Sequence, residues 1–291
     1  MSNHSNNNEA FALRSFPAGG GREGALIIIK IGGNIIDDEI KLLSFLKDFA
    51  SVEGNKILVH GGGKLATRVA EAMGIPQQMV EGRRITDAET LKIVTMVYAG
   101  YINKNIVALL QAQGCNSLGL SGADGNVILS HKRVVNSHLG AGGAEGLYGF
   151  AGDVDEVNVA FIQSLLNQNN SLVFSPITHN KQGLLLNTNA DTIAQEIAKA
   201  MSAFYKVSLI YCFEKPGVLM DAADDSSVIT SINPATFIEL KEKKIIADGM
   251  IPKLHNAFAA LNAGVQQISI GHAENLQQII LQQSGTAIIH E

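Results

Sequence analysis

Short runs of β-branched and apolar residues alternate with longer amphipathic stretches from residue 26 onwards. Residues 26–31 (LIIIKI) form an apolar run interrupted by one lysine, which is typical of a buried parallel strand. In residues 37–50, apolar positions recur at helical spacing behind three acidic residues, which favours a helix. Strands that alternate with helices predict a mostly parallel sheet covered on both faces, the α/β class.

The same alternation places the remaining elements. A glycine-rich section at residues 117–158 predicts a hairpin-like region. We expect helices at residues 64–73, 86–113, 158–167, 189–201, 234–243, 252–263 and 273–283, and strands at residues 56–59, 172–174, 206–211, 267–270 and 286–289.

Composition and charge exclude several classes of protein. The chain has 291 residues, of which 46% are hydrophobic, a share too high for a disordered chain. No uninterrupted apolar run approaches the ~20 residues that cross a bilayer. The net charge of -5 argues against a nucleic-acid or anionic-membrane partner, because either needs a broad basic face.

The cysteines and the first residues indicate a compartment. Cys115 and Cys212 form no C-x-x-C or zinc pattern, which is typical of reduced thiols in a reducing compartment. Residues 1–25 are rich in Asn, Ser and Gly and lack the basic-then-apolar order of a signal peptide. We therefore expect a flexible arm over residues 1–25 and a cytoplasmic protein.

Two glycine clusters directly follow predicted strands. Gly32 and Gly33 follow the first strand, and residues 61–63 are three glycines between the second strand and its helix. Glycine permits positive φ and lets backbone N–H groups approach an anion, and a helix N-terminus adds unpaired donors. Two such turns at the carboxyl ends of strands favour a phosphate site, whereas one alone would favour a turn without a ligand.

Known glycine fingerprints fit poorly. The Walker A pattern fails, because Leu65 follows Lys64 where serine or threonine is required. The dinucleotide pattern G-x-G-x-x-[GA] matches at Gly61, Gly63 and Ala66, but it normally opens the first strand–helix unit and here it opens the second. A nicotinamide oxidoreductase therefore stays a minor alternative.

Charged residues near these turns suggest the chemistry. Lys30 interrupts an apolar strand, so it needs a counter-charge or an anionic ligand unless it snorkels at a strand edge. Lys253 lies in a helix's first turn, where the dipole disfavours a cation. Asp191 stands at a helix start, where it could hold the lysines or simply cap the helix. Arg83 and Arg84 precede a helix, and a guanidinium suits bidentate carboxylate binding.

Together these residues predict phosphoryl transfer. That reaction needs positioned positive charge around the transferred group more than covalent help. Two lysines, glycine amides, Mg²⁺ and an acid that holds the lysines supply this charge. No cysteine nucleophile, metal-ligand cluster, G-x-S-x-G elbow or Ser/His/Asp grouping competes. The residues alone thus predict an enzyme that handles phosphate and a small carboxylate.

Nine short motifs point to a family. They are IIKIGGN (28–34), VHGGGK (59–64), EGRRIT (81–86), GLSGADG (119–125), GFAGDVDEVN (149–158), LNTNAD (186–191), PGVL (216–219), ADGMIPK (247–253) and GT-A-I (285–288). In their order and spacing the chain resembles the amino-acid kinases, and within them the enzymes that phosphorylate N-acetyl-L-glutamate.

The resemblance implies a fold and a reaction. The fold is an open three-layer αβα sandwich of the α/β class with a mostly parallel central sheet. Residues 26–170 would form an N-lobe that binds acyl-glutamate and dimerises, and residues 171–291 a C-lobe that binds ATP. The implied reaction moves the γ-phosphoryl group of MgATP to the substrate's side-chain carboxylate, in arginine biosynthesis. The protein would hold no metal directly, because Mg²⁺ arrives with ATP.

The resemblance also implies roles for individual residues. Lys30 and Lys253 match transition-state-stabilising lysines, and Asp191 matches the aspartate that orients them. Residues 131–150 would cover the acyl group. The implied binding residues are Gly32 and Gly33 for the phosphoryl group; Gly62, Gly63, Arg84 and Asn187 for the acyl-glutamate; and Glu214, Lys215, Gly217, Val218, Leu219, Ile245, Ile246 and Ala247 for ATP.

Departures from the family pattern leave choices open. Phe213 begins the segment FEKP where the pattern has Ser/Thr-Asp-Val, so the resemblance places this segment beside ATP without specifying the individual contacts that it makes. Ala123 stands where many relatives have lysine. Residues 1–25 contain no long amphipathic helix like the one that interlaces arginine-inhibited hexamers, which favours a homodimer without strong feedback inhibition.

The substrate also leaves alternatives. Another amino-acid kinase substrate, such as carbamate, aspartate, glutamate or a nucleoside monophosphate, is the nearest rival. Arg84, Asn187 and the segment at residues 149–158 favour an acylglutamate, in which succinyl could replace acetyl. A non-catalytic nucleotide-binding regulator is remote, because a sensor has no need of both lysines and the aspartate.

Overall fold

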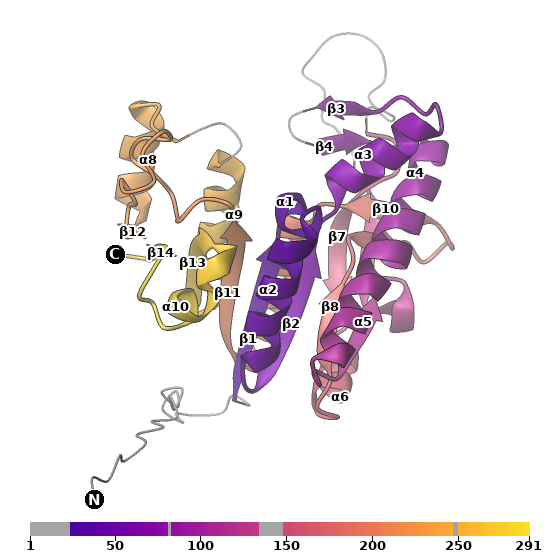
Figure 1. Cartoon of the computed structure of the whole chain (residues 1–291), viewed down its shortest axis with the longest axis horizontal. Coiled ribbons are helices and arrows are strands. Elements are labelled where there is room, and N and C mark those ends of the chain that lie inside the picture. Colours follow the sequence, from indigo (N-terminus) through magenta and orange to yellow (C-terminus); the bar gives the residue numbers. More distant parts are fainter. Residues whose placement is uncertain (1–23, 81–82, 134–147, 247–249) are drawn as a thin grey trace, which may run out of the picture.

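An eight-stranded sheet runs through the middle of the molecule (Figure 1). The structure is a computed structural model, which describes residues 24–80, 83–133, 148–246 and 250–291. In order across the sheet, the strands are β12 (Ser231–Ile232), β14 (Thr286–Ile288), β13 (Gln267–His272), β11 (Lys206–Phe213), β1 (Ala25–Ile31), β2 (Asn55–His60), β8 (Ser171–Phe174) and β5 (Ser117–Leu120). All neighbouring pairs are parallel except β13 with β14, which confirms the predicted mostly parallel α/β sheet.

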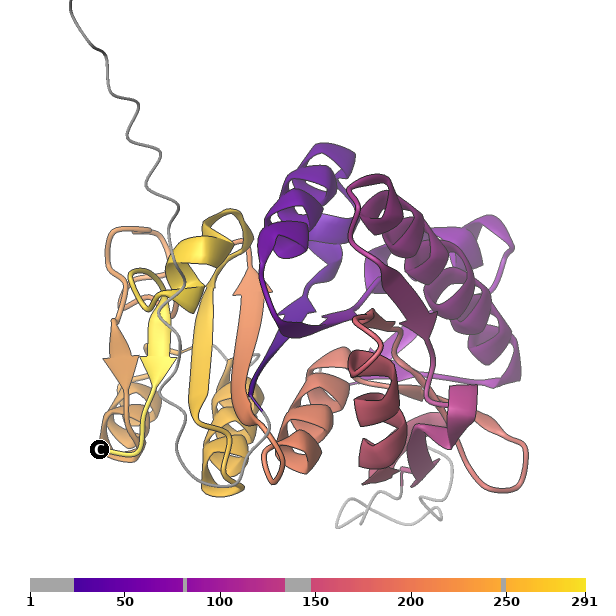
Figure 2. The same cartoon turned by 90° about the horizontal axis from the view of Figure 1, so that it is seen from below.

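Helices cover both faces of this sheet (Figure 2). Strand β1 shows why, because its side chains alternate between two cores: Leu26 and Ile28 join one, and Ile27, Ile29 and Ile31 join the other. The first core is closed by α6 (Val159–Leu166), α7 (Ala190–Met201), α8 (Pro234–Glu242) and α9 (Ile251–Asn262), and the second by α1 (Gly33–Ile36), α2 (Glu39–Ser51), α3 (Gly63–Ala72), α4 (Ala88–Val94), η1 (Thr95–Ile102), α5 (Asn103–Ala112) and α10 (Leu276–Ile280).

Smaller sheets flank the N-terminal side of the central sheet. The glycine-rich section was expected to be hairpin-like throughout, but this was wrong for its first strand, β5, which joins the central sheet. The hairpin itself is present, because β6 and β7 pair antiparallel. The strands outside the central sheet are β6 (Ile128–Lys132), β7 (Ala151–Val157), β9 (Ile177–His179) and β10 (Leu185–Thr188), which close a small barrel, and the pair β3 (Gln78–Val80) and β4 (Arg83–Ile85).

The long helix expected at residues 86–113 begins two residues later. Asp87 caps it by accepting a hydrogen bond from the backbone N–H of Thr90 at 2.7 Å, whereas Thr86 is buried in a bridge to Gly149. By length and composition alone, Ala88–Ala112 could cross a membrane, and it is the one such helix among the described residues. It packs against the second core through α4, η1 and α5, as the core helix of an α/β enzyme does.

Strands from both proposed lobes share sheets. β8 pairs with β2 and β5, and β9 and β10 pair with β6 and β7, although β8, β9 and β10 all follow residue 170. The chain thus crosses to the C-terminal half of the central sheet only after β10. The division into lobes at residue 170 stays a prediction, as does the arm at residues 1–25, of which 1–23 lie outside the described residues.

Candidate active site

Two glycine turns lie side by side at the carboxyl ends of β1 and β2. The strands are parallel neighbours, and Ile31 pairs with His60 in register. The Gly61 N–H donates to the Ile31 carbonyl at 3.2 Å. The two turns also approach each other further along: a Cβ placed on Gly33 would lie 3.9 Å from the backbone nitrogen of Gly63. The sheet therefore joins two backbone segments that are distant in the sequence.

The backbone at Gly62 strongly favours glycine. Its φ of 146° lies in a region that L side chains rarely adopt. A Cβ at this position would also lie 2.3 Å from Cδ1 of Ile102, far inside van der Waals contact. Helix α3 begins at the next residue, so its unpaired N–H groups and positive dipole end face the turn. The turn is thus shaped to receive an anion.

Two lysines converge on one aspartate. Lys30 Nζ lies 2.7 Å from Oδ1 of Asp191, and Lys253 Nζ lies 3.5 Å from Oδ2. Lys30 follows Leu26 and Ile28 at period two, so it faces helix α7, which carries Asp191, and helix α9, which carries Lys253. The three side chains of this cluster come from β1, α7 and α9, which lie far apart in the sequence.

Asp191 is not the cap of its helix. Asn189 caps α7, because its Oδ1 accepts from the backbone N–H of Asp191 at 2.8 Å and of Thr192 at 3.3 Å. The Asp191 carboxylate is buried and points to the lysines instead. This settles the alternative that the sequence left open at this helix start.

The electrostatics of the cluster favour an anionic ligand. Burial alone raises the pKa of Asp191, but Lys30 and Lys253 outweigh it and hold that pKa below its usual range. Burial lowers the pKa of Lys253, an effect that Asp191 opposes and Lys30 reinforces. One carboxylate therefore faces two ammonium groups, and the excess positive charge suits a phosphate.

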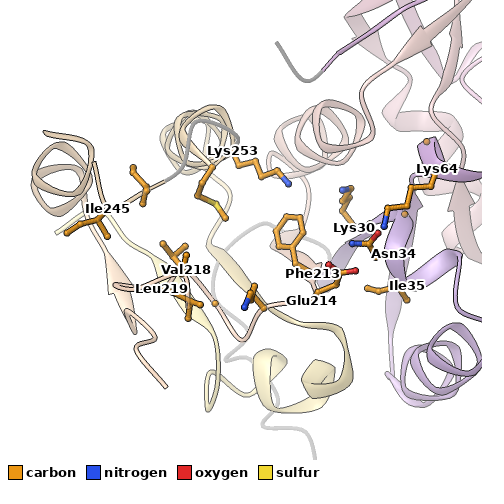
Figure 3. Close-up of a pocket in the computed structure, with 18 residues that line it drawn as sticks. Lys30, Asn34, Ile35, Lys64, Phe213, Glu214, Val218, Leu219, Ile245 and Lys253 are labelled. Carbon is orange, nitrogen blue, oxygen red and sulfur yellow. The ribbon is translucent and has the colours of Figure 1, made fainter. Parts of the chain in front are cut away.

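A cavity of about 580 Å³ opens beside the two lysines. In Figure 3 the apolar side chains of Ile245, Val218 and Leu219 lie on one side of it, and Lys30 and Lys64 lie on the other. The cavity can therefore hold a ligand with a flat apolar part and an anionic part. Its lining includes the residues predicted for phosphate and ATP, namely Gly32, Gly33, Glu214, Lys215, Gly217, Val218, Leu219, Ile245 and Ile246.

A second cavity, of about 220 Å³, lies on the other side of Lys30. Lys30, Gly33 and Gly63 line both cavities, whereas Lys253 lines only the larger and Asp191 only the smaller. The two spaces thus meet at the Lys30 ammonium. The smaller one is lined by all the residues predicted for acyl-glutamate, namely Gly62, Gly63, Arg84 and Asn187.

The polar wall of the smaller cavity is fixed by hydrogen bonds. Arg84 is buried, and its Nη2 donates to the Gly63 carbonyl and the Thr67 hydroxyl, both at 2.9 Å. Its Nη1 donates to Gln77. Asn187 Nδ2 donates to the Thr86 hydroxyl at 2.9 Å. These contacts hold a guanidinium and an amide at the cavity edge, where they can receive a carboxylate.

Several cavity residues were not assigned from the sequence. Phe213 lies between Lys30 and Lys253 in the larger cavity, and the sequence marked it only as a departure from the family pattern. Asn34 also lines this cavity, and its buried Oδ1 has no hydrogen-bond partner among the described residues. Tyr98 lines the smaller cavity from inside the long helix, where periodicity gives no functional signal.

Two expectations fall outside the described residues. Ala247 was expected beside ATP, and residues 134–147 belong to the section expected to cover the acyl group; both lie in the undescribed ranges. Among the residues that the structure does describe, no three His, Cys, Asp or Glu side chains form a metal site. A direct protein site for a metal is therefore not found in the described part of the chain.

The αβα sandwich and its two cavities, which meet at a buried ammonium group, define a phosphotransferase of small molecules. The model of the amino acid kinase family matches residues 25–272. The chain belongs to this family.

Curated relatives and solved structures agree with this family. The acetylglutamate kinase of Cytophaga hutchinsonii is 55% identical over 255 residues, which cover 88% of this chain and 94% of that protein. The acetylglutamate kinase of Parabacteroides distasonis is 54% identical over 253 residues, covering 87% and 96%. The smu.665 protein of Streptococcus mutans UA159 has a TM-score of 0.72 at 26% identity, covering 91% of this chain and 99% of that one. An N-acetylglutamate synthase from Neisseria gonorrhoeae shares the fold, with a TM-score of 0.76 at 20% identity over 91% of this chain and 59% of that one.

Proposed function

We propose that the chain is an ATP-dependent kinase that phosphorylates the γ-carboxylate of N-acetyl-L-glutamate in arginine biosynthesis. The products are N-acetyl-L-glutamyl 5-phosphate and ADP. The observation that carries this proposal is the position of Lys30, whose ammonium group lies where the two cavities meet. The choice of N-acetyl-L-glutamate as the substrate is supported by relatives named acetylglutamate kinase, which are about 55% identical over most of the chain.

The larger cavity suits ATP. Its apolar side chains can receive the adenine ring, and its lysines and glycine amides can receive the phosphates. In the part of the chain that the structure describes, the buried Asn34 Oδ1 in this cavity has no hydrogen-bond partner, which fits a ligand that brings its own cation. Mg²⁺ bound to the phosphates would neutralise part of their charge and fix their geometry.

The reaction follows from the order of the groups. An oxygen of the substrate's γ-carboxylate attacks the γ-phosphorus of ATP, the bond from that phosphorus to the β,γ-bridging oxygen breaks, and ADP leaves with the electron pair. Lys30, between the cavities, neutralises the transferred phosphoryl group. Lys253 lines only the nucleotide cavity, so it neutralises the leaving oxygen. Asp191 holds both ammonium groups and accepts no proton, because its pKa is below its usual range.

The smaller cavity suits the acyl-glutamate. Arg84 and Asn187 would hold the α-carboxylate side, and the Gly62–Gly63 amides would orient the reacting carboxylate. Met79 and Tyr98 give the cavity an apolar wall that an acyl group can contact. In this arrangement the substrate's γ-carboxylate points at Lys30 and the nucleotide.

We further propose that the enzyme works as a cytoplasmic homodimer with its substrate lobe and nucleotide lobe divided near residue 170. The dimer proposal follows from the family resemblance and from apolar side chains left exposed on η1, Met96 and Tyr101. We expect no nucleic-acid or membrane partner, in line with the net charge of -5.

A hydroxamate assay tests the proposed function. Hydroxylamine traps an acyl phosphate as a coloured hydroxamate, so the assay reports carboxylate phosphorylation directly. We expect ATP-dependent product with N-acetyl-L-glutamate and far less with glutamate or aspartate. A higher kcat/KM with N-succinyl-L-glutamate would keep the kinase and change the acyl group. No product with either acyl-glutamate would contradict the proposal.

A further inference from the structure

The side chain at the end of β11 lies directly beside the two lysines. Phe213 is half-buried and lines the larger cavity. Its ring is nearly parallel to that of Tyr211, with centroids 6.5 Å apart and an angle of 10° between the planes. Because Tyr211 is buried in the first core, this stack fixes the orientation of the Phe213 ring.

Both ammonium groups lie within cation–π distance of this ring. Lys253 Nζ is 3.9 Å from the Phe213 centroid, and Lys30 Nζ is 5.4 Å from it. A cation is attracted to an aromatic face within ≈6 Å of the centroid, and more strongly where water is excluded. Among the described residues, the Lys253 contact is the shortest of the cation–π contacts, and no other ring faces two cations.

The charges around Lys253 explain what the ring contributes. Asp191 from α7 is its carboxylate partner at 3.5 Å, but it lies closer to Lys30, at 2.7 Å. Lys30 from β1 repels Lys253, and burial also disfavours its charged form. Among the described residues of the neighbouring helix α8, the titratable side chains are exposed, and on α9 itself His255 packs edge-on against Phe237. The ring is therefore the second group that stabilises the Lys253 ammonium.

An aromatic face suits this task better than a second carboxylate would. A carboxylate would neutralise Lys253 completely and repel the phosphates of a nucleotide. The ring carries no net charge, so it holds the ammonium in place and leaves its positive charge for the ligand. The stack on Tyr211 keeps this surface in position before the nucleotide arrives.

We propose that the Phe213 ring is a positioning residue that holds the Lys253 ammonium, and to a lesser degree that of Lys30, for the leaving phosphate of ATP. This inference rests on the proposed kinase function. It also places the effect on the nucleotide side of the reaction, because Phe213 lines the nucleotide cavity but not the smaller one.

Fluorinated phenylalanines at position 213 test the proposal. Each added fluorine weakens the negative face of the ring while its shape changes little. We expect kcat to fall stepwise from phenylalanine through monofluoro- and difluoro- to pentafluorophenylalanine, by about tenfold in total. The KM for N-acetyl-L-glutamate should change by less than about twofold, because the ring does not touch that cavity. Phe213→Tyr should retain activity and Phe213→Leu should behave like the pentafluoro variant.

The matched control is the same fluorination series at Phe237. This ring is buried in the same half of the molecule and contacts His255 and Phe258, with no lysine over its face among the described contacts. We expect no stepwise trend in kcat there. An equal trend at both positions, or none at position 213, would overturn the proposal.

A measurement without turnover separates this proposal from the kinase proposal. The ¹³Cε resonance of Lys253, assigned by its loss in Lys253→Arg, reports the pKa of this lysine in the free enzyme. We expect Phe213→Leu to lower that pKa by about one unit, the equivalent of a tenfold loss for the charged form. An unchanged pKa overturns the ring's role even if the kinase is active, whereas a shifted pKa in a chain that makes no hydroxamate contradicts only the kinase function.

Discussion

A single carboxylate carries the arrangement of charge at the centre of the site. Asp191 contacts both lysines, and Asn189 performs the capping that would otherwise explain an acid at this position. We therefore expect Asp191→Asn to lower kcat by at least about 100-fold, because the lysines lose the group that orients them. Circular dichroism should show that the variant remains folded.

The control for this variant is Glu239→Gln on α8. It removes a carboxylate from an exposed ion pair with Lys243, and exposed pairs contribute only about 0–1 kcal/mol. Its kcat should match that of the parent. Near-normal turnover in Asp191→Asn would mean that the carboxylate only satisfies buried lysines and has no part in the chemistry.

Lys253 offers a separate test of the leaving-group assignment. It lines the nucleotide cavity but not the smaller one, so Lys253→Ala should remove an interaction made with the phosphates. We expect kcat to fall by about 100- to 1,000-fold while the KM for the acyl-glutamate changes little. Steady-state kinetics with each substrate varied in turn will show the split. An effect confined to the KM of the acyl-glutamate would contradict the assignment of Lys253 to the leaving group.

His60 makes stability depend on pH. It is fully buried at the end of β2, where its Nδ1 contacts the Gly61 carbonyl at 2.8 Å and its Nε2 contacts Asn103 Nδ2 at 3.2 Å. The amide nitrogen Nδ2 can only donate, so Nε2 accepts and Nδ1–H donates, which is the neutral ring. Burial lowers the pKa of His60 from 6.5 to about 4.

The sign of the pH effect follows from this depressed pKa. Between about pH 4 and 6.5 the unfolded chain binds a proton at His60 that the folded chain does not, so the free energy of unfolding rises with pH across that window and is level above it. The difference is of the order of 3 kcal/mol. Urea unfolding at several pH values measures it, and His60→Gln should flatten the slope. An identical slope in the variant would assign the effect to other groups.

At the scale of elements, hydrophobic periodicity predicted which helices and strands exist better than it predicted where they begin and end. The strand at β1 and the helix at α2 follow directly from apolar spacing, and both are present. The helix at residues 86–113 was placed two residues early, because Thr86 and Asp87 are both good caps and only the tertiary bridge of Thr86 decides between them. No hydrophobic pattern in the sequence predicts the π-helical segment η1 within this helix.

Tertiary pairing accounts for the other differences. β5 reads like part of a glycine-rich hairpin, since its partner β8 lies far along the chain and no local pattern reveals that pairing. The helix expected at residues 273–283 is a 3₁₀ turn, Ala273–Asn275, followed by α10. In the site, glycine turns and lysines were predictable from their residue types, whereas the Phe213 ring was not, because an apolar residue ending a strand normally signals core.

The turn after β2 provides the prediction at this scale. Gly62→Ala must strain a φ of 146° and displace Ile102, so we expect a loss of about 1–3 kcal/mol in stability together with most of the activity. Thermal unfolding and the hydroxamate assay measure both. Gly74→Ala is the matched control, because its φ is 73° but a Cβ there has nothing within 4 Å and it lines neither cavity, so it should lose some stability and keep the activity. If Gly62→Ala melted and turned over like the parent, the turn would tolerate a side chain and its tight shape would not be required.

At the scale of the whole molecule, one sheet organises two reactive spaces. The carboxyl ends of β1, β2 and β11 all lie at the same edge because these strands are parallel. The alternation of β1 sends Lys30 to the α7–α9 face and leaves the glycine turns between the two cavities. The sequence predicts that Lys30 needs a counter-charge or an anionic ligand, but not which helices supply it, since helix order around a sheet is a property of the complete topology.

The same scale raises the question of assembly. The helix Ala88–Ala112 is apolar enough for a membrane span, but only 44% of its most apolar 18-residue stretch is buried inside the molecule. Met96 and Tyr101 are 53% and 65% exposed on it. Its segments α4 and α5 lie at one side of the molecule (Figure 1). Large apolar side chains that stay exposed on one helix fit a protein–protein interface.

We therefore expect light scattering after size exclusion to give a mass of about twice 30.9 kDa. Tyr101→Glu should shift the protein to the monomer, because a buried unpaired charge costs several kcal/mol at an interface. Ile238→Glu is the control, since Ile238 is 56% exposed on α8 in the opposite half of the molecule and should leave the mass unchanged. A parent protein that is monomeric at micromolar concentration, or a Tyr101→Glu variant that remains a dimer while Ile238→Glu dissociates, would move the interface away from this helix.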